Sequence, residues 1–198
     1  MANVLIVYAT KEGQTAKIAR HIAHTLSALG HETELFDADH PVPLLDLGRF
    51  QFAILGGPIH AGGYPRSLAR FVRKNRAFLE RVRSAFFSVG LAVESHHSDG
   101  RAQTLPLVDK FVRETGWQPQ RVELIAGALL YSKYNPFIRL VMRHIAQKEG
   151  GDTDTSRDYE YTDFAAVERF AREFVARAVP SALESPAASA LGGTAPPS

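Results

Sequence analysis

The sequence predicts a single α/β domain built on a doubly wound parallel sheet of five strands. Short apolar runs alternate with amphipathic helical patterns, which is typical of a parallel sheet with helices on both faces. The first apolar run leads through a compact loop into a helix, the arrangement that forms anion sites in such sheets. The 198 residues, of which 45% are hydrophobic, are enough for one domain with a substantial core.

Five short apolar runs are predicted to be the strands. They are residues 4–8, 33–36, 52–55, 85–89 and 122–126.

Helical periodicity connects these strands. The first helix follows residue 15 and is predicted to stop at Gly30, since glycine often ends a helix. A second helix begins after Pro65, a third ends near Gly116, and a fourth covers about 163–178. Residues 39–50 contain two prolines and a glycine and are predicted to be loop.

Two segments interrupt this regular alternation. Residues 129–157, near strand five, form an insertion far longer than ordinary connections, and such insertions usually have a function. Residues 179–198 are rich in Pro, Ala, Ser and Gly and are predicted to be a disordered tail. The folded domain is therefore expected to cover residues 1–178.

Composition excludes several classes of chemistry. The chain has no cysteine, which rules out disulfides, thiolate nucleophiles and iron–sulfur clusters, and no spacing of His and carboxylates indicates a metal site. It has no run of 18 apolar residues and begins directly with a strand, so a cytoplasmic protein without a transmembrane helix is expected.

Positive charge is distributed unevenly along the chain. The net charge is only +2, yet residues 66–83 contain seven cations and one acid. This stretch favours an anionic partner or is simply a solvated helix face. No helix-turn-helix, aromatic RNA-binding motif or zinc finger supports nucleic acid as that partner.

Residues 4–15 read V-L-I-V-Y-A-T-K-E-G-Q-T and predict a phosphate site. Backbone amides and the start of a helix attract an anion, and Thr10 and Thr15 add hydroxyl donors. Gly13 permits a backbone conformation or a close approach that a side chain would block. The loop lacks the Lys-Ser/Thr end of a P-loop and the G-x-G-x-x-G of a dinucleotide site. A simple strand–helix turn with a Thr cap is the alternative.

The T-x-x-G-x-T pattern of this loop resembles the FMN phosphate loop of flavodoxins, which usually have a third hydroxyl where this chain has Glu12. The resemblance implies non-covalent FMN, the strand order 2-1-3-4-5, and two ring-binding loops after strands three and four. In the first of these loops the glycines could instead serve turn geometry alone. Tyr64 is the aromatic residue offered to the ring, and Trp117 is expected only to pack.

The residues expected to bind the cofactor come from these three loops. They are Thr10, Lys11, Glu12, Gly13, Gln14, Thr15, Pro58, Ile59, His60, Ser88, Val89, Gly90, Leu91 and Ala92. His60 is also a candidate proton relay, because histidine titrates near neutral pH.

Further motifs narrow the resemblance. They are F-F-S-V-G-L at residues 86–91, A-G-A-L-L-Y at 126–131, G-G-D-T-D-T at 150–155 and Y-T-D-F at 161–164. With the first loop, they resemble the flavodoxin-fold, quinone-dependent protoporphyrinogen oxidases of bacterial haem synthesis. The resemblance covers residues 1–178 and implies six-electron oxidation of protoporphyrinogen IX to protoporphyrin IX. Menaquinone or ubiquinone would be the acceptor.

An amphipathic helix is predicted over residues 135–148. It is either packed against the core or, over 136–148, a lid that touches the inner face of the cell membrane. Rival functions are a flavodoxin-like electron carrier, an NAD(P)H:quinone reductase and a flavin-free scaffold. The sequence leaves a homo-oligomer open.

Overall fold

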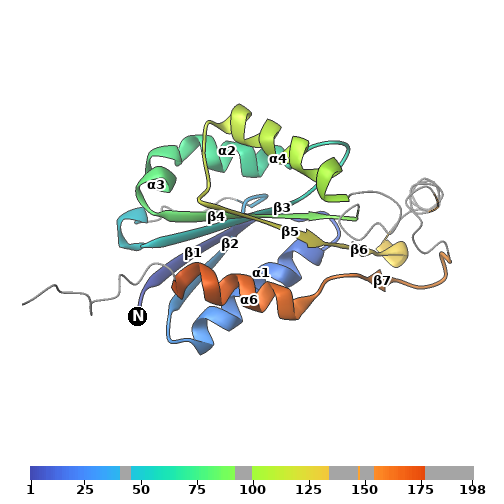
Figure 1. The fold of residues 1–198 in the computed structure, drawn as a ribbon, viewed down its shortest axis with the longest axis horizontal. Helices are drawn as coiled ribbons and strands as arrows, with labels where there is room; N and C mark the ends of the chain where they lie inside the picture. Colours follow the sequence, from blue (N-terminus) through green and yellow to red (C-terminus); the bar gives the residue numbers. More distant parts are fainter. Residues whose placement is uncertain (41–45, 92–99, 134–146, 148–153, 177–198) are drawn as a thin grey trace, which may run out of the picture.

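The computed structural model describes residues 1–40, 46–91, 100–133, 147 and 154–176. Five strands form one parallel sheet in the order β2-β1-β3-β4-β5 (Figure 1). The strands are β1 Asn3–Tyr8, β2 Glu32–Asp37, β3 Phe52–Pro58, β4 Arg83–Gly90 and β5 Arg121–Ala126. The predicted fold class and strand order are therefore confirmed, and no strand end differs from its predicted position by more than three residues.

Helices cover both faces of this sheet (Figure 1). One face carries α1 (Gln14–Ala28) and α6 (Phe164–Ala176), which pack against each other. The other carries α2 (Arg66–Lys74), α3 (Arg76–Arg81) and α4 (Gly100–Thr115). All four predicted helices are present, and the short α3 is an addition that begins after a break at Asn75.

Alternating side chains of the strands divide the core into two layers. Ile6, Ile54 and Phe87 pack beneath α1 and α6, whereas Leu55 and Phe86 pack beneath α2 and α4. This division follows from the strand period of two residues, because both faces of each central strand are buried.

Trp117 belongs to the second layer and is fully buried. Its Nε1 donates a hydrogen bond of 3.0 Å to Ser84 Oγ, which satisfies the indole N–H inside the core. The expectation that this tryptophan only packs agrees with the structure.

Beyond the sheet, the two ends of the segment after strand five pair with each other. β6 (Ala128–Leu129) and β7 (Tyr159–Glu160) form a small antiparallel sheet, and a 3₁₀ turn (Tyr131–Lys133) follows β6. Residues 134–146 and 148–153 of the predicted insertion lie outside the described residues. The same holds for nearly all of the predicted helix 135–148 and for the tail 179–198, so those expectations stay predictions.

The loop predicted over residues 39–50 contains one 3₁₀ turn, Leu47–Arg49, and its residues 41–45 lie outside the described part. None of the helices in the described ranges is both long and apolar enough to cross a membrane.

Candidate functional site

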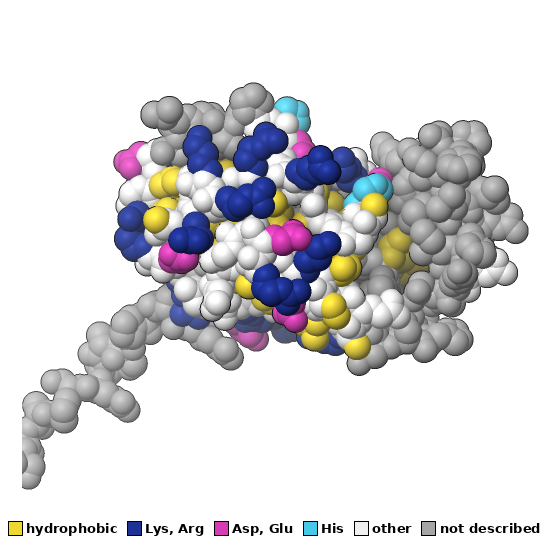
Figure 2. Space-filling view, turned by 90° about the horizontal axis from the view of Figure 1, so that it is seen from above, with side chains coloured by type: hydrophobic (Ala, Val, Ile, Leu, Met, Phe, Trp, Pro, Cys, Tyr) yellow, Lys and Arg dark blue, Asp and Glu magenta, His cyan; other side chains and the backbone are white. Residues whose placement is uncertain are grey.

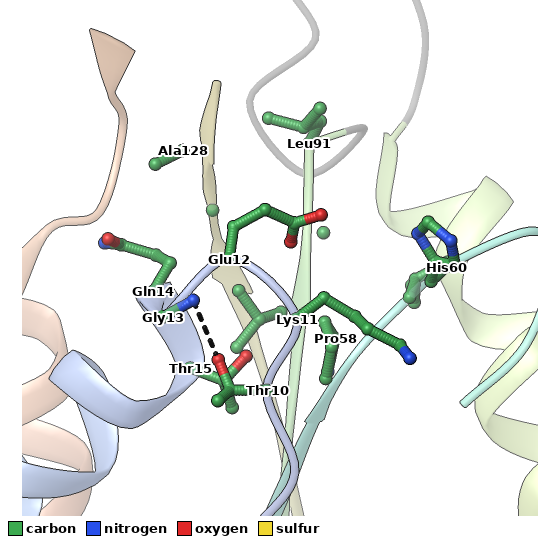
Figure 3. Close-up of a pocket in the computed structure, with 14 residues that line it drawn as sticks. Thr10, Lys11, Glu12, Gly13, Gln14, Thr15, Pro58, His60, Leu91 and Ala128 are labelled. Carbon is green, nitrogen blue, oxygen red and sulfur yellow. Dashed lines mark hydrogen bonds between the residues drawn. The ribbon is translucent and has the colours of Figure 1, made fainter. Parts of the chain in front are cut away.

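A cleft of about 690 Å³ opens at the carboxyl edge of the sheet, where the segments that follow β1, β3, β4 and β5 converge (Figure 3). Its volume is that of an ordinary small-molecule site. Twelve of the fourteen predicted cofactor residues line it. The two others are Ser88, whose side chain is placed elsewhere, and Ala92, which lies outside the described residues.

The loop between β1 and α1 forms the floor of this cleft. Gly13 has φ +101°, and its N–H donates a hydrogen bond of 3.1 Å to Thr10 Oγ1 (Figure 3). Thr15, in the first turn of α1, is 1% exposed. No acidic residue lies in that turn and no side-chain cap occupies the helix start, so an anion would meet the positive end of α1.

The conformation of Gly13 accounts for a glycine at this position. A Cβ added there would meet nothing within 4 Å, whereas a φ of +101° is one that side chains rarely adopt. The predicted backbone conformation is therefore present, and the predicted close approach of a ligand stays a prediction.

Two opposite charges stand on the same loop. In Figure 3 the carboxylate of Glu12 extends toward Leu91, and the amine of Lys11 extends on the side of His60. Glu12 replaces the third hydroxyl expected from flavodoxins, and it points away from Thr10 and Thr15. It therefore does not take part in the floor that these two threonines build.

A tight turn after β3 forms a second wall. The backbones of His60 and Gly63 exchange hydrogen bonds of 2.9 and 3.1 Å, and the two residues between them have positive φ. Two positive φ angles are typical of a type I′ turn. Ile59 N donates a hydrogen bond of 2.8 Å to Val89 O, which joins this turn to the end of β4. His60 is exposed at the rim.

Glycines around this turn have structural explanations within the chain. A Cβ at Gly56 would lie 1.9 Å from the Phe87 ring, and a Cβ at Gly57 would lie 2.8 Å from Leu68. Gly62 has φ +75° inside the turn. Core packing and turn geometry therefore account for these glycines without a ligand.

Tyr64 and Ser88 are placed away from the cleft, contrary to the sequence prediction. The Tyr64 hydroxyl donates to Ser88 Oγ at 2.7 Å, and the ring packs against Phe86 and Phe111 with centroid distances of 5.0 Å. Burial raises the pKa of Tyr64 to about 12, although the hydrogen bond to Ser88 opposes the shift. The pair holds the turn after β3 onto the sheet.

Gly127 and Ala128 line the cleft but were missed by sequence reasoning. Gly127 N donates to Gly90 O at 3.1 Å, so the chain leaving β5 runs beside the end of β4. A Cβ at Gly127 would lie 3.3 Å from Val89 Cγ1, a tight contact that a small shift of the Val89 side chain would relieve. The A-G-A-L motif directly after the fifth apolar run could have indicated both residues.

Polar contacts fasten β7 to the loop that forms the floor. Gln14 Nε2 donates to Glu160 Oε1 and Thr162 Oγ1, and Thr162 Oγ1 donates to Ala126 O. Burial alone would raise the pKa of Glu160, but hydrogen bonds from Lys17 and Gln14 and the charge of Lys17 outweigh it and lower that pKa. Glu160 is thus ionised over a wider pH range than an isolated glutamate.

No group of three His, Asp or Glu side chains in the described ranges could hold a metal ion. The cleft is instead a site of backbone amides, hydroxyls and apolar walls.

The arrangement of sheet and cleft defines a class of protein. A flavodoxin domain model matches residues 5–156. Two flavodoxins of known structure have the same fold. A short-chain flavodoxin associated with a non-canonical PDU bacterial microcompartment has a TM-score of 0.54 and 12% identity over 90% of this chain and 99% of that one. Oxidised flavodoxin 1 from Bacillus cereus has a TM-score of 0.51 and 16% identity over 88% and 98%.

Curated relatives narrow this class. The Escherichia coli (strain K12) protein named protoporphyrinogen IX dehydrogenase (quinone) is 33% identical over 169 residues, 85% of this chain and 92% of that protein. The Leishmania major protein of the same name is 33% identical over 176 residues, 87% of this chain and 74% of that one. The chain therefore belongs to the flavodoxin-domain family and, within it, to the protoporphyrinogen IX dehydrogenase (quinone) family, and it is an oxidoreductase.

Proposed function

We propose that the protein binds FMN in the cleft and oxidises protoporphyrinogen IX to protoporphyrin IX, a step of haem synthesis, with a quinone as electron acceptor. The observation that carries the proposal is the convergence of the segments after β1, β3, β4 and β5 on one cleft, in a chain 33% identical to dehydrogenases named for this substrate and acceptor.

The residues present fit FMN. The phosphate would lie at the start of α1, where Gly13 adopts a positive φ and Thr10 and Thr15 offer hydroxyl groups. A flat ring would lie between the wall of residues 58–60 and the wall of residues 89–91. When bound, FMN would supply reversible two-electron redox chemistry, which the side chains of this cysteine-free protein do not provide.

The chain's own residues would then position the reactants, bind a substrate carboxylate and accept a proton. Ile59, Leu91 and Ala128 give the cleft apolar walls, which suit a macrocycle and a quinone. Lys11 is the cation on the cleft floor that could meet a substrate propionate. His60 stands exposed at the rim, where it could accept a proton leaving the substrate and release it to water.

The apolar character of both reactants supports a location at the membrane surface. We propose that the protein is cytoplasmic and attaches peripherally to the inner face of the cell membrane. There it would meet menaquinone or ubiquinone.

The test is anaerobic mixing of the FMN-loaded protein with protoporphyrinogen IX, followed by addition of a quinone. We expect the flavin absorbance to bleach, then to recover on quinone addition, while porphyrin fluorescence grows faster than in a reaction with FMN but no protein. The matched control is the protein stripped of flavin, which should show neither change.

Two results would contradict the proposal. A flavin that stays oxidised with this substrate and is not reduced by NAD(P)H would indicate an electron carrier. Rapid bleaching by NAD(P)H instead of the porphyrinogen would indicate an NAD(P)H:quinone reductase.

A further inference from the structure

The helices α2, α3 and α4 concentrate positive charge on one side of the molecule. Together they contain nine cations and three acids, a net charge of +6, whereas the whole chain carries only +2. Figure 2, which looks onto this side, shows Lys and Arg side chains distributed over the surface with few acidic ones among them. We call this surface the basic face. Its cations are Arg66, Arg70, Arg73, Lys74, Arg76, Arg81, Arg101, Lys110 and Arg113.

Within the described structure, most of this charge has no acidic partner. α2 contains no acidic residue, and Arg70, Arg73 and Lys74 are exposed on the side opposite the buried Leu68 and Val72. None of these three cations forms an ion pair with a described residue. The ion pairs on the basic face are Arg76–Glu80 at 3.3 Å and Lys110–Glu114 at 3.9 Å, both exposed.

The opposite face differs in this respect. On α6, Arg169 pairs with Asp163 and Arg172 pairs with Glu168, at 3.7 and 2.7 Å. Lysine and arginine side chains near one another repel, so a face that keeps them unpaired is suited to an external anion.

We propose that the basic face binds the surface of a membrane containing anionic phospholipids. Leu105 on α4 is 46% exposed and stands one helical turn after Arg101. Peripheral membrane helices combine cations that meet lipid headgroups with apolar side chains that enter the interface, and Leu105 supplies the second element. Binding of nucleic acid would not call for an apolar side chain here, and the polyglutamate comparison below tests for an acidic protein.

The position of the basic face relative to the cleft connects the lipid contact with the proposed function. α2 and α4 follow β3 and β4 in the chain, so both helices begin on the side of the sheet where His60 and Leu91 line the cleft. A membrane held against the basic face would therefore lie near the cleft and shorten the path of a lipid-soluble quinone. This last step rests on the quinone-dependent oxidation proposed above, and the lipid contact assigns a surface to the peripheral attachment proposed there.

The experiment measures binding of the full, FMN-loaded chain to phosphatidylcholine vesicles with and without about 30% phosphatidylglycerol. The test variant is Arg70→Gln/Arg73→Gln on α2, and the matched control is Arg169→Gln/Arg172→Gln on α6. Both variants lose two exposed helical arginines and change the net charge equally.

We expect the wild type to bind the anionic vesicles and not the neutral ones, with affinity that falls as salt is added. The α2 variant should bind about 30-fold more weakly, and the α6 variant should bind nearly as the wild type does. Leu105→Ser should also weaken binding, at unchanged net charge. An equal loss of vesicle binding in the two arginine variants would mean that only net charge matters, and would overturn the proposal. Tighter binding to duplex DNA or to polyglutamate than to anionic vesicles would also overturn it.

A second assay separates this proposal from the proposed function. Oxidation of protoporphyrinogen IX with a water-soluble quinone, without vesicles, should be unchanged in the α2 variant. A raised KM there would assign these arginines to substrate binding and overturn the membrane contact. Absence of that activity in the wild type would overturn the proposed function and leave the vesicle result standing.

Discussion

Gln14 and Glu160 lie 146 residues apart in the chain, and Gln14 Nε2 donates a hydrogen bond of 2.7 Å to Glu160 Oε1. Gln14 is the first residue of α1, and Glu160 is the last residue of β7. Lys17 Nζ also donates to both oxygens of Glu160, at 2.7 and 2.8 Å. The proposed phosphate loop is thereby fastened to the strand at which the chain returns from the segment after β5.

This contact predicts a pH-dependent contribution to stability. The pKa of Glu160 is lowered from its ordinary value of 4.5, so the ionised carboxylate stabilises the folded state above about pH 4.5. The contribution is lost as the pH falls through the folded-state pKa. We expect Glu160→Gln to be less stable than the wild type at pH 7 and equal to it well below pH 4. Because both partners are more than a third exposed, the difference should stay below about 1 kcal/mol.

Urea unfolding at several pH values measures this difference. The control is Glu168→Gln, which breaks an exposed pair with Arg172 inside α6. A Glu160→Gln effect of the same size at pH 7 and at pH 3 would show that its charge is not what stabilises the contact.

Gly13→Ala and Gly30→Ala form a matched pair that tests the phosphate loop. Both glycines have positive φ, +101° and +82°, and a Cβ at either would meet nothing within 4 Å. Each substitution should therefore cost about 1 kcal/mol in free energy of unfolding, from backbone strain alone. Only Gly13→Ala should also weaken FMN binding, by several-fold, because Gly13 lies in the cleft. Flavin fluorescence titration measures this, and equal FMN affinities in the two variants would place the phosphate elsewhere.

Most of the fold could be predicted because each element carries its own local pattern. The five strands are apolar runs, and α1 ends where Gly30 predicts its end. The short α3 could not be predicted, because Phe78 and Leu79 continue the apolar pattern of α2 and nothing in the composition marks the break at Asn75. Such a break depends on how the chain packs back onto β4.

The candidate site was predictable in part for the same reason. The loop from Thr10 to Thr15 is local, and its residue types indicate its geometry. The A-G-A-L motif could have indicated Gly127 and Ala128, but not the contacts that place them. Ala128 is placed by the pairing of β6 with β7, about thirty residues apart, and Gly127 by its hydrogen bond to Gly90 at the end of β4. The prediction that Ser88 lines the cleft failed for a similar reason, because it depended on a contact between distant residues. Ser88 lies on the side of β4 that faces α2 and α4, as Phe86 does, and there its hydroxyl meets Tyr64.

Tyr64→Phe tests the anchor of the turn after β3. It removes the hydrogen bond to Ser88 and should cost about 1 kcal/mol at neutral pH. The pKa of Tyr64 is raised from 10.0 to about 12, so the wild type should lose stability as the pH rises from about 10 toward 12, and the variant should lose less. Ser88→Ala removes the same bond but keeps the titrating phenol, and should retain the alkaline loss. Identical alkaline profiles for wild type and Tyr64→Phe would contradict the burial of this hydroxyl.

Thr15→Val separates phosphate binding from ring binding. Thr15 is 1% exposed in the cleft floor, and its hydroxyl is proposed to donate to the FMN phosphate. Loss of a hydrogen bond to a charged group costs about 1.5–3 kcal/mol, so FMN affinity should fall by roughly 10- to 100-fold. Affinity for riboflavin, which has no phosphate, should hardly change. The control is Thr25→Val, buried on the same helix but outside the cleft, which should leave both affinities intact. If Thr15→Val weakened riboflavin and FMN binding equally, Thr15 would support the loop structurally rather than hold the phosphate.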